Sequence, residues 1–108
     1  MHVAQAFRAA AQTGTCALCG QPGAGLDAHH VLPRSKLKRL LAGKGKVVPP
    51  SVLYDPRNAV GLHRTPCHEW VTSRARTLPR SAVPDRTWEF AREHGLEWLL
   101  EAECPDVP

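Results

Sequence analysis

The chain has 108 residues, of which 43% are hydrophobic, and it carries four cysteines, six histidines and a formal net charge of +4. A chain of this length forms at most one domain, over residues 1–108, and buries roughly 60–68% of its unfolded surface, so a metal site would add stability that a small core lacks. No run of about 18 apolar residues is present, which excludes a membrane span, and no secretory signal pattern opens the chain. We therefore expect a cytoplasmic protein in which a Cys-x-x-Cys pair serves a metal or redox site rather than a disulfide.

The first half of the sequence predicts a helix, a metal-binding turn and a strand. Apolar residues at helical spacing predict a short helix over residues 3–12. The turn Cys16–Cys19 has the form of a zinc knuckle, and residues 26–32 form a candidate strand that ends at Pro33. Glycines and prolines between residues 34 and 56 interrupt any regular pattern, so we expect a loop with a brief helix there.

The next segment predicts a second strand followed by a helix. Residues 58–63 alternate loosely between apolar and polar side chains, which favours the second strand of a hairpin. Thr65 and Pro66 are typical of an N-cap and a first helical position, and the helix should run to about Ala75. This pattern places a strand–strand–helix core at about residues 16–76.

A helical tail is expected over about residues 85–103. Asp85 is the predicted N-cap of one helix, and a second helix follows after a glycine stop. Trp88 and Trp98 lie at helical spacing with other apolar residues, so we expect both in the core. Cys104 is interpreted as a free thiol near a frayed terminus. The predicted class is α+β, with an N-terminal helix and two C-terminal helices around the strand–strand–helix core.

Two local pairs predict a zinc cross-brace. Cys16 and Cys19 form the first pair, and His63 and Cys67 form the second after a long intervening segment. Zinc prefers four cysteine or histidine ligands in a tetrahedron, and two local pairs are the usual way in which a chain supplies them. His68 is the alternative to His63 as the fourth ligand. The competing interpretation makes His63 a surface residue at a strand end and Cys67 a small buried apolar residue.

A second group of polar side chains surrounds the predicted hairpin. Its members are Asp27, His29, His30, Asn58 and His68. Adjacent histidines in a strand point to opposite faces, so they share one site only where the strand bends or ends, and Pro33 supplies such an end. The ordinary histidine pKa of about 6.5 suits a general base near neutral pH. A divalent cation would neutralise a phosphate at such a site.

These residues resemble the HNH nucleases, a family with a ββα-metal motif. The resemblance rests on His-His-x-x-Pro-Arg-Ser at residues 29–35, an asparagine at 58 and Cys-His at 67–68, and it covers about residues 16–73. Within it, residues 62–73 look closest to small HNH proteins of phages and prophages of actinobacteria. The resemblance implies that the strand–strand–helix core is an HNH core, and that the zinc pairs form a structural site.

The resemblance also implies a role for each residue of the second group. His30 would be the general base, His29 and His68 would be ligands of a catalytic divalent metal, and Asn58 would orient the base or its loop. Asp27 would assist the metal site. Thr72 stands where several members of the family have a further histidine, which favours a loosely held Mg²⁺ or Mn²⁺, with Zn²⁺ or Ni²⁺ as alternatives.

A basic segment follows the histidine pair, because residues 28–54 include six Lys or Arg residues and no acidic one. We expect phosphate contacts from this segment and from the far end of the helix that follows, by Arg34, Lys36, Lys38, Arg39, Arg74 and Arg76. A solvated loop with surplus lysines is the alternative interpretation. Residues 93–108 carry five acidic residues and no basic one, and we expect this tail to face away from DNA.

The expected function is that of a metal-dependent DNA endonuclease of a bacterial or phage-infected cell, which hydrolyses phosphodiester bonds with low sequence specificity by nicking or double-strand cleavage. The resemblance implies products with 5′-phosphate and 3′-hydroxyl ends. One alternative is a zinc-stabilised DNA-binding module without catalysis. The other is an accessory protein of a phage packaging motor that docks on terminase subunits through its acidic C-terminal helices. No isolated apolar patch in the sequence predicts a homodimer.

Overall fold

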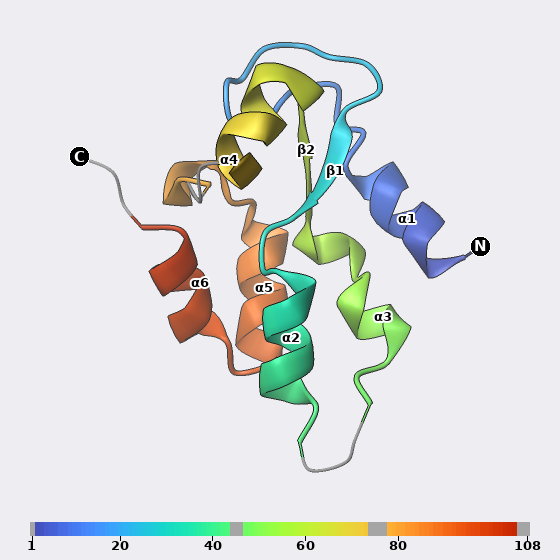
Figure 1. The fold of residues 1–108 in the computed structure, drawn as a ribbon, viewed down its shortest axis with the longest axis vertical. Coiled ribbons are helices and arrows are strands. Elements are labelled where there is room, and N and C mark those ends of the chain that lie inside the picture. The colour runs from blue at the N-terminus through green and yellow to red at the C-terminus, as the bar shows by residue number, and fades with distance from the viewer. Residues whose placement is uncertain (1, 44–46, 74–77, 106–108) are drawn as a thin grey trace.

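Two short antiparallel strands, β1 (Asp27–His30) and β2 (Ala59–Leu62), lie among helices in the computed structural model (Figure 1). The structure describes residues 2–43, 47–73 and 78–105. The strands pair with Asp27 opposite Leu62 and His30 opposite Ala59. The predicted hairpin of an α+β chain is therefore confirmed in its strands and their pairing.

Helices make up much of the rest of the described chain. The α-helices are α1 (Val3–Ala10), α2 (Arg34–Leu41), α3 (Pro50–Leu53), α4 (Glu69–Ser73), α5 (Asp85–Glu93) and α6 (Glu97–Glu103). Three further helical turns connect them, namely η1 (Pro56–Asn58), η2 (Arg64–His68) and η3 (Arg80–Ala82). Figure 1 shows α1 along one side of the hairpin and α4 on the other, with α2, α5 and α6 together beyond the end of β1.

The first helix, α1, packs on the hairpin through one apolar face. Phe7 is 3% exposed and forms a small cluster with Ala11 and Ala59 at the start of β2. His2 caps the helix by accepting the Ala4 N–H, and the Gln5 side chain accepts the His2 N–H in return. The predicted helix is thus present, and its packing brings the N-terminal segment beside the first strand.

The segment between the strands is more helical than the sequence predicts. The expected loop with a brief helix contains two helices, α2 and α3, and α2 begins directly after Pro33. Pro33 itself is extended, which suits the residue before a helix. Leu37 is completely buried in the main core. Tertiary burial of this one face stabilises α2 in a segment whose glycines and prolines predict a loop.

The helix after β2 begins differently from the prediction. Thr65 has extended backbone angles, and its hydroxyl donates to the Glu69 carboxylate at 3.1 Å rather than capping a backbone N–H. A π-helical turn, η2, precedes the α-helical turn α4. The predicted end near Ala75 lies outside the described residues.

The C-terminal helices complete the main core, with two corrections to the predicted burial. Asp85 is the first residue of α5, and Pro84 occupies the cap position where Asp85 was expected. Trp98 is 56% exposed, so its predicted place in the core is wrong, whereas Trp88 packs partly buried against the core. Cys104 is 1% exposed within the core, not at a frayed end. No helix in the described residues is long and apolar enough to cross a membrane.

Candidate functional site: a Cys3His cluster and a histidine-lined cleft

The predicted zinc pairs come together at one end of the hairpin. Cys16 and Cys19 lie in the turn after α1, His63 directly follows β2, and Cys67 lies in η2. Their ligand atoms all lie within 4.8 Å of one another. Among the described residues, this is the one group of three or more such side chains that gathers so closely. A Cys3His set of this kind is consistent with a structural zinc site.

Hydrogen bonds orient the His63 ring toward the sulfur atoms. Its Nε2 donates to the Pro22 carbonyl oxygen at 3.0 Å, because a carbonyl only accepts. The lone pair is therefore on Nδ1, which lies 3.3 Å from Cys19 Sγ. Gly23 permits this approach, since an added Cβ there would lie 2.6 Å from His63 Nε2. His63, and not His68, is thus the histidine that presents a nitrogen to the cluster.

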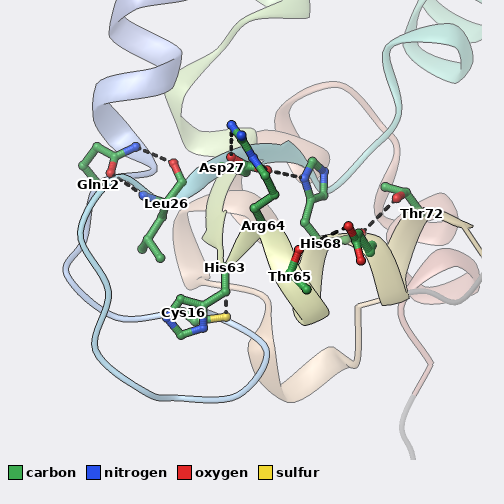
Figure 2. Close-up of polar contacts among 10 residues, drawn as sticks. Gln12, Cys16, Leu26, Asp27, His63, Arg64, Thr65, His68 and Thr72 are labelled. Atoms are coloured by element: carbon green, nitrogen blue, oxygen red, sulfur yellow. Dashed lines mark hydrogen bonds and ion pairs between the residues drawn. The ribbon is translucent and has the colours of Figure 1, made fainter.

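The buried thiols of the cluster differ in their affinity for protons. Burial raises the pKa of Cys16, but N–H groups of Cys19, His63 and Leu18 near its sulfur outweigh burial and lower the pKa to about 6. Figure 2 shows the contact from the His63 N–H, at 3.5 Å. Burial, followed by the neighbouring sulfur atoms, raises the pKa of Cys67 to about 12. Cys16 therefore forms a thiolate readily, whereas the thiolate of Cys67 would need a nearby cation to stabilise it.

A cleft of about 360 Å³ lies between α1, the hairpin and the start of α2. Three members of the predicted histidine group line it, namely Asp27, His30 and His68. The other lining residues come from α1, β1, α2 and the end of α3, and they are Ala4, Phe7, Arg8, Ala28, Arg34 and Tyr54. The structure thus brings residues from four distant segments of the chain to one cavity.

Asp27 lies between two basic side chains in this cleft (Figure 2). His68 Nδ1 is 2.9 Å from Asp27 Oδ2, and two nitrogens of Arg64 lie 3.4 Å from the carboxylate oxygens. The hydrogen bond with His68 lowers the pKa of Asp27 more than burial raises it, and Arg64 lowers it further. Because the carboxylate accepts, Nδ1 of His68 donates and its Nε2 keeps the lone pair. Such a carboxylate–histidine pair is typical of the support behind a metal ligand.

His29 lies on the same face of β1 as Asp27, two residues along the strand. Its ring meets the His68 ring edge to face, with 5.5 Å between centroids. Burial, followed by the nearby His68 and His30, lowers the pKa of His29 to about 4, so the ring is neutral at neutral pH. The three side chains Asp27, His29 and His68 lie together, though less tightly than the four of the Cys3His cluster.

His30 is fixed from two directions. Its Nε2 is 2.9 Å from the Leu53 carbonyl oxygen, which only accepts, so Nε2 donates and Nδ1 keeps the lone pair. Phe7 stacks on the ring with 4.0 Å between centroids, and Tyr54 meets it edge-on. Burial lowers the pKa of His30 to about 4 despite the opposing contact with Leu53, and Arg34 lowers it further. The pKa is thus below the ordinary value of about 6.5 that the sequence-based expectation of a general base used, and the ring is neutral at neutral pH and held in one orientation.

Two amide side chains hold the ends of β1 in the same way. Beyond its C-terminal end, Asn58 accepts the Leu32 N–H and donates to the Leu32 carbonyl oxygen, each at 2.9 Å. Before its N-terminal end, Gln12 accepts the Leu26 N–H at 2.9 Å and donates to the Leu26 carbonyl oxygen at 2.7 Å (Figure 2). Asn58 is completely buried, and its contacts fix the chain two residues after His30 rather than the His30 ring itself.

The basic residues after the histidine pair fall on α2. Arg34 lines the cleft, and its guanidinium donates to the Tyr54 hydroxyl and lies 5.4 Å from the centre of the Tyr54 ring. Lys38 and Arg39 are exposed in the last turn of α2. These three side chains therefore occupy a helix that leads away from the cleft, in the segment where a loop with a brief helix was expected.

The remaining residues that were predicted to contact phosphate are Lys36, Arg74 and Arg76. Lys36 forms an ion pair with Glu103 of α6, so the acidic C-terminal helix reaches the basic helix α2. The expectation that the acidic tail faces away from a nucleic acid therefore does not describe Glu103, which lies against a residue predicted to bind phosphate. Arg74 and Arg76 lie outside the described residues.

Several cleft residues have no signal in the sequence. In the sequence, Phe7 is only an apolar residue of a predicted helix. Leu53 acts through its backbone carbonyl, which no side-chain pattern indicates. Tyr54 and Arg64 lie outside the motif spacing, although Arg64 directly follows the zinc ligand His63. Only the positions of α1, the end of α3 and η2 beside the hairpin bring these residues to His30 and Asp27.

No model of a protein family, no curated protein and no solved structure matches the chain. The geometry of the chain's own residues is therefore what supports a function. Two features of that geometry matter most: the Cys3His cluster that joins three segments, and the cleft with its oriented histidines.

Proposed function

We propose that the protein is a metal-dependent DNA endonuclease of the HNH type, which hydrolyses phosphodiester bonds with low sequence specificity. The observation that supports this most directly is the orientation of His30. Its Nε2 is engaged by a backbone carbonyl and its Nδ1 keeps a lone pair, in a cleft shared with Asp27 and His68. The ββα arrangement of β1, β2 and the η2–α4 helix agrees with the resemblance to that family.

In this proposal the chain's own residues hold and move one proton. A water molecule beside His30 gives a proton to Nδ1 while its oxygen forms a bond to phosphorus. The bond from phosphorus to the 3′-oxygen breaks, and that oxygen takes a proton from solvent. Leu53 and Phe7 hold the His30 ring during the transfer, and Asn58 holds the chain that follows it.

The residues beside the cleft have the donor chemistry of a divalent-cation site. His68 Nε2 keeps its lone pair because Nδ1 donates to Asp27, and the neutral ring of His29 lies against that of His68. Imidazole and carboxylate ligands suit Mn²⁺, Zn²⁺ or Ni²⁺, and with few protein ligands also Mg²⁺. A cation held there would supply positive charge to the phosphate and to the leaving 3′-oxygen.

The Cys3His cluster serves stability in this proposal. It joins the turn after α1 to the segment after β2 and to η2, which carries His68. A zinc ion there would hold the helical turn and the hairpin at a constant distance, and therefore His68 beside Asp27. A chain of this size has a small core, so such a link contributes much of the fold's stability.

A plasmid-nicking assay tests the activity. Protein that carries one zinc per chain is freed of other metals and incubated with supercoiled DNA and added Mg²⁺, Mn²⁺, Ni²⁺ or Zn²⁺. We expect nicking that His30→Ala lowers at least 100-fold, because general-base catalysis contributes about 10²–10⁴-fold. Arg92→Gln is the control, since Arg92 is exposed and lies outside the cleft. Equal nicking by the folded His30→Ala protein would refute the role of His30.

A zinc-stabilised DNA-binding module without catalysis is the second candidate. It is favoured by the contacts of Asp27, which already pairs with both His68 and Arg64. Retention of labelled DNA by the protein, with no cleavage under any of the four metals, would support this candidate. Absence of both binding and cleavage would leave the accessory role with packaging proteins, for which capture of terminase subunits is the direct test.

A further inference from the structure

The N-terminal helix α1 forms one wall of the cleft, although it lies outside the residues on which the resemblance rests. Ala4, Phe7 and Arg8 all line the cavity. The stacking of Phe7 on His30, at 4.0 Å between ring centroids, fixes this helix directly beside the histidine. The position of Arg8, one residue later on α1, is therefore set relative to His30.

Arg8 and Arg34 face the same cavity from two different helices. Arg34 is the first residue of α2, which begins just beyond the end of β1, and Arg8 belongs to α1 beside the hairpin (Figure 1). Both side chains belong to exposed residues. A strand of nucleic acid that enters the cleft would therefore meet guanidinium groups from two different helices, each able to donate two parallel hydrogen bonds to a phosphate.

Ion pairs neutralise three of the other arginines, and these two differ from those three. Arg57, Arg64 and Arg92 each contact a carboxylate, at Asp55, Asp27 and Glu97 respectively. Neither Arg8 nor Arg34 pairs with a carboxylate within the described part of the chain. Their positive charge is therefore not neutralised internally, and the cleft is where that charge is presented.

We propose that α1 belongs to the nucleic-acid-binding surface and that Arg8 binds a backbone phosphate of DNA in the cleft, with Arg34 on another side. The inference rests on the proposed function, and it adds to it a contact from a helix outside the resemblance. Arg8 contacts phosphate rather than a base, so it increases affinity for any sequence alike.

The test is DNA binding as a function of salt, measured by fluorescence anisotropy with a labelled 20-base-pair duplex. The zinc-loaded protein is used with no other divalent metal, so cleavage does not interfere. Loss of one phosphate contact lowers the slope of log K against log salt by about 0.9. Arg8→Gln should therefore bind DNA more weakly than the wild-type protein at low salt, and the difference should shrink as salt rises. The ratio of the wild-type binding constant to that of the variant should be about 3.5-fold smaller at 200 mM than at 50 mM salt.

Two control variants make the result specific. Arg8→Lys keeps the charge and should keep most of the slope, whereas Arg92→Gln removes an exposed arginine that pairs with Glu97 outside the cleft and should change nothing. A slope for Arg8→Gln equal to that of Arg92→Gln would overturn the inference and leave the proposed function standing. If the wild-type protein does not bind the duplex at all, both the inference and the proposed function are wrong.

Discussion

The buried amide of Asn58 should contribute far more to stability than an exposed amide that makes the same hydrogen bonds. Asn58→Ala removes a pair of bonds to the Leu32 backbone at a completely buried position. Gln12→Ala removes the same kind of pair to the Leu26 backbone, where the hydrogen bonds are only partly buried. The two variants therefore differ mainly in whether water can replace the lost partner.

The expected magnitudes follow from that difference. A hydrogen bond contributes about 1 kcal/mol net, but a buried donor or acceptor left without a partner costs about 1–3 kcal/mol. Asn58→Ala leaves both the Leu32 N–H and its carbonyl without their partner. We therefore expect a loss of about 3–4 kcal/mol for Asn58→Ala and about 1 kcal/mol for Gln12→Ala. The first is a large share of the roughly 5–15 kcal/mol that stabilises a small domain.

Urea unfolding of the zinc-loaded proteins, followed by circular dichroism, measures both losses. The slope of free energy against urea should be the same for all three proteins, because the folded structure is retained. In the nicking assay, Asn58→Ala should lower activity under conditions where the protein is fully folded, because the chain after His30 is no longer held. Equal losses of stability for the two variants would refute the reasoning about burial.

Two further predictions concern metal and pH. Cys16→Ser should abolish stoichiometric zinc in elemental analysis and unfold the chain, because structural zinc contributes on the order of 10 kcal/mol, whereas Cys104→Ser in the core should keep one zinc. A zinc-free chain that melts normally would contradict the cluster. Burial raises the pKa of Asp55, but its contacts with Arg57 outweigh burial and lower the pKa. The ionised Asp55 therefore stabilises the fold above its ordinary pKa of 3.8, and this contribution is lost as pH falls below that value. Asp55→Asn should therefore cost about 1 kcal/mol at pH 7, and less near pH 3. Urea unfolding measures both differences in the free energy of unfolding, and Glu89→Gln at an exposed position is the control, for which the difference from wild type should be the same at both pH values.

The elements that local chemistry determines were predictable from the sequence. The two strands were found from short apolar runs and from Pro33, which cannot continue β1. The four residues of the zinc cluster were found because a Cys-x-x-Cys turn and a His-x3-Cys segment bring ligands together within a few residues. Both are short-range patterns, and short-range patterns persist in whatever fold surrounds them.

Elements that depend on burial against distant residues were not predictable in the same way. Helix α2 buries Leu37 in a core that draws residues from most of the described chain, whereas the sequence signals only a brief helix there. The same reason explains Trp98 and Cys104, since the face of α6 that is buried depends on where α5 places it. Helical spacing alone predicts an apolar face, not its partner.

By itself, therefore, the sequence determined the hairpin, the α+β class and the three cysteines of the Cys3His cluster. Only the tertiary structure decided which histidine joins that cluster, and which nitrogen of His30 keeps its lone pair. Those outcomes depend on single acceptors from remote segments, the Pro22 and Leu53 carbonyl oxygens and the Asp27 carboxylate. An imidazole has two equivalent choices until such a partner selects one, and the partner is set by how the whole chain packs.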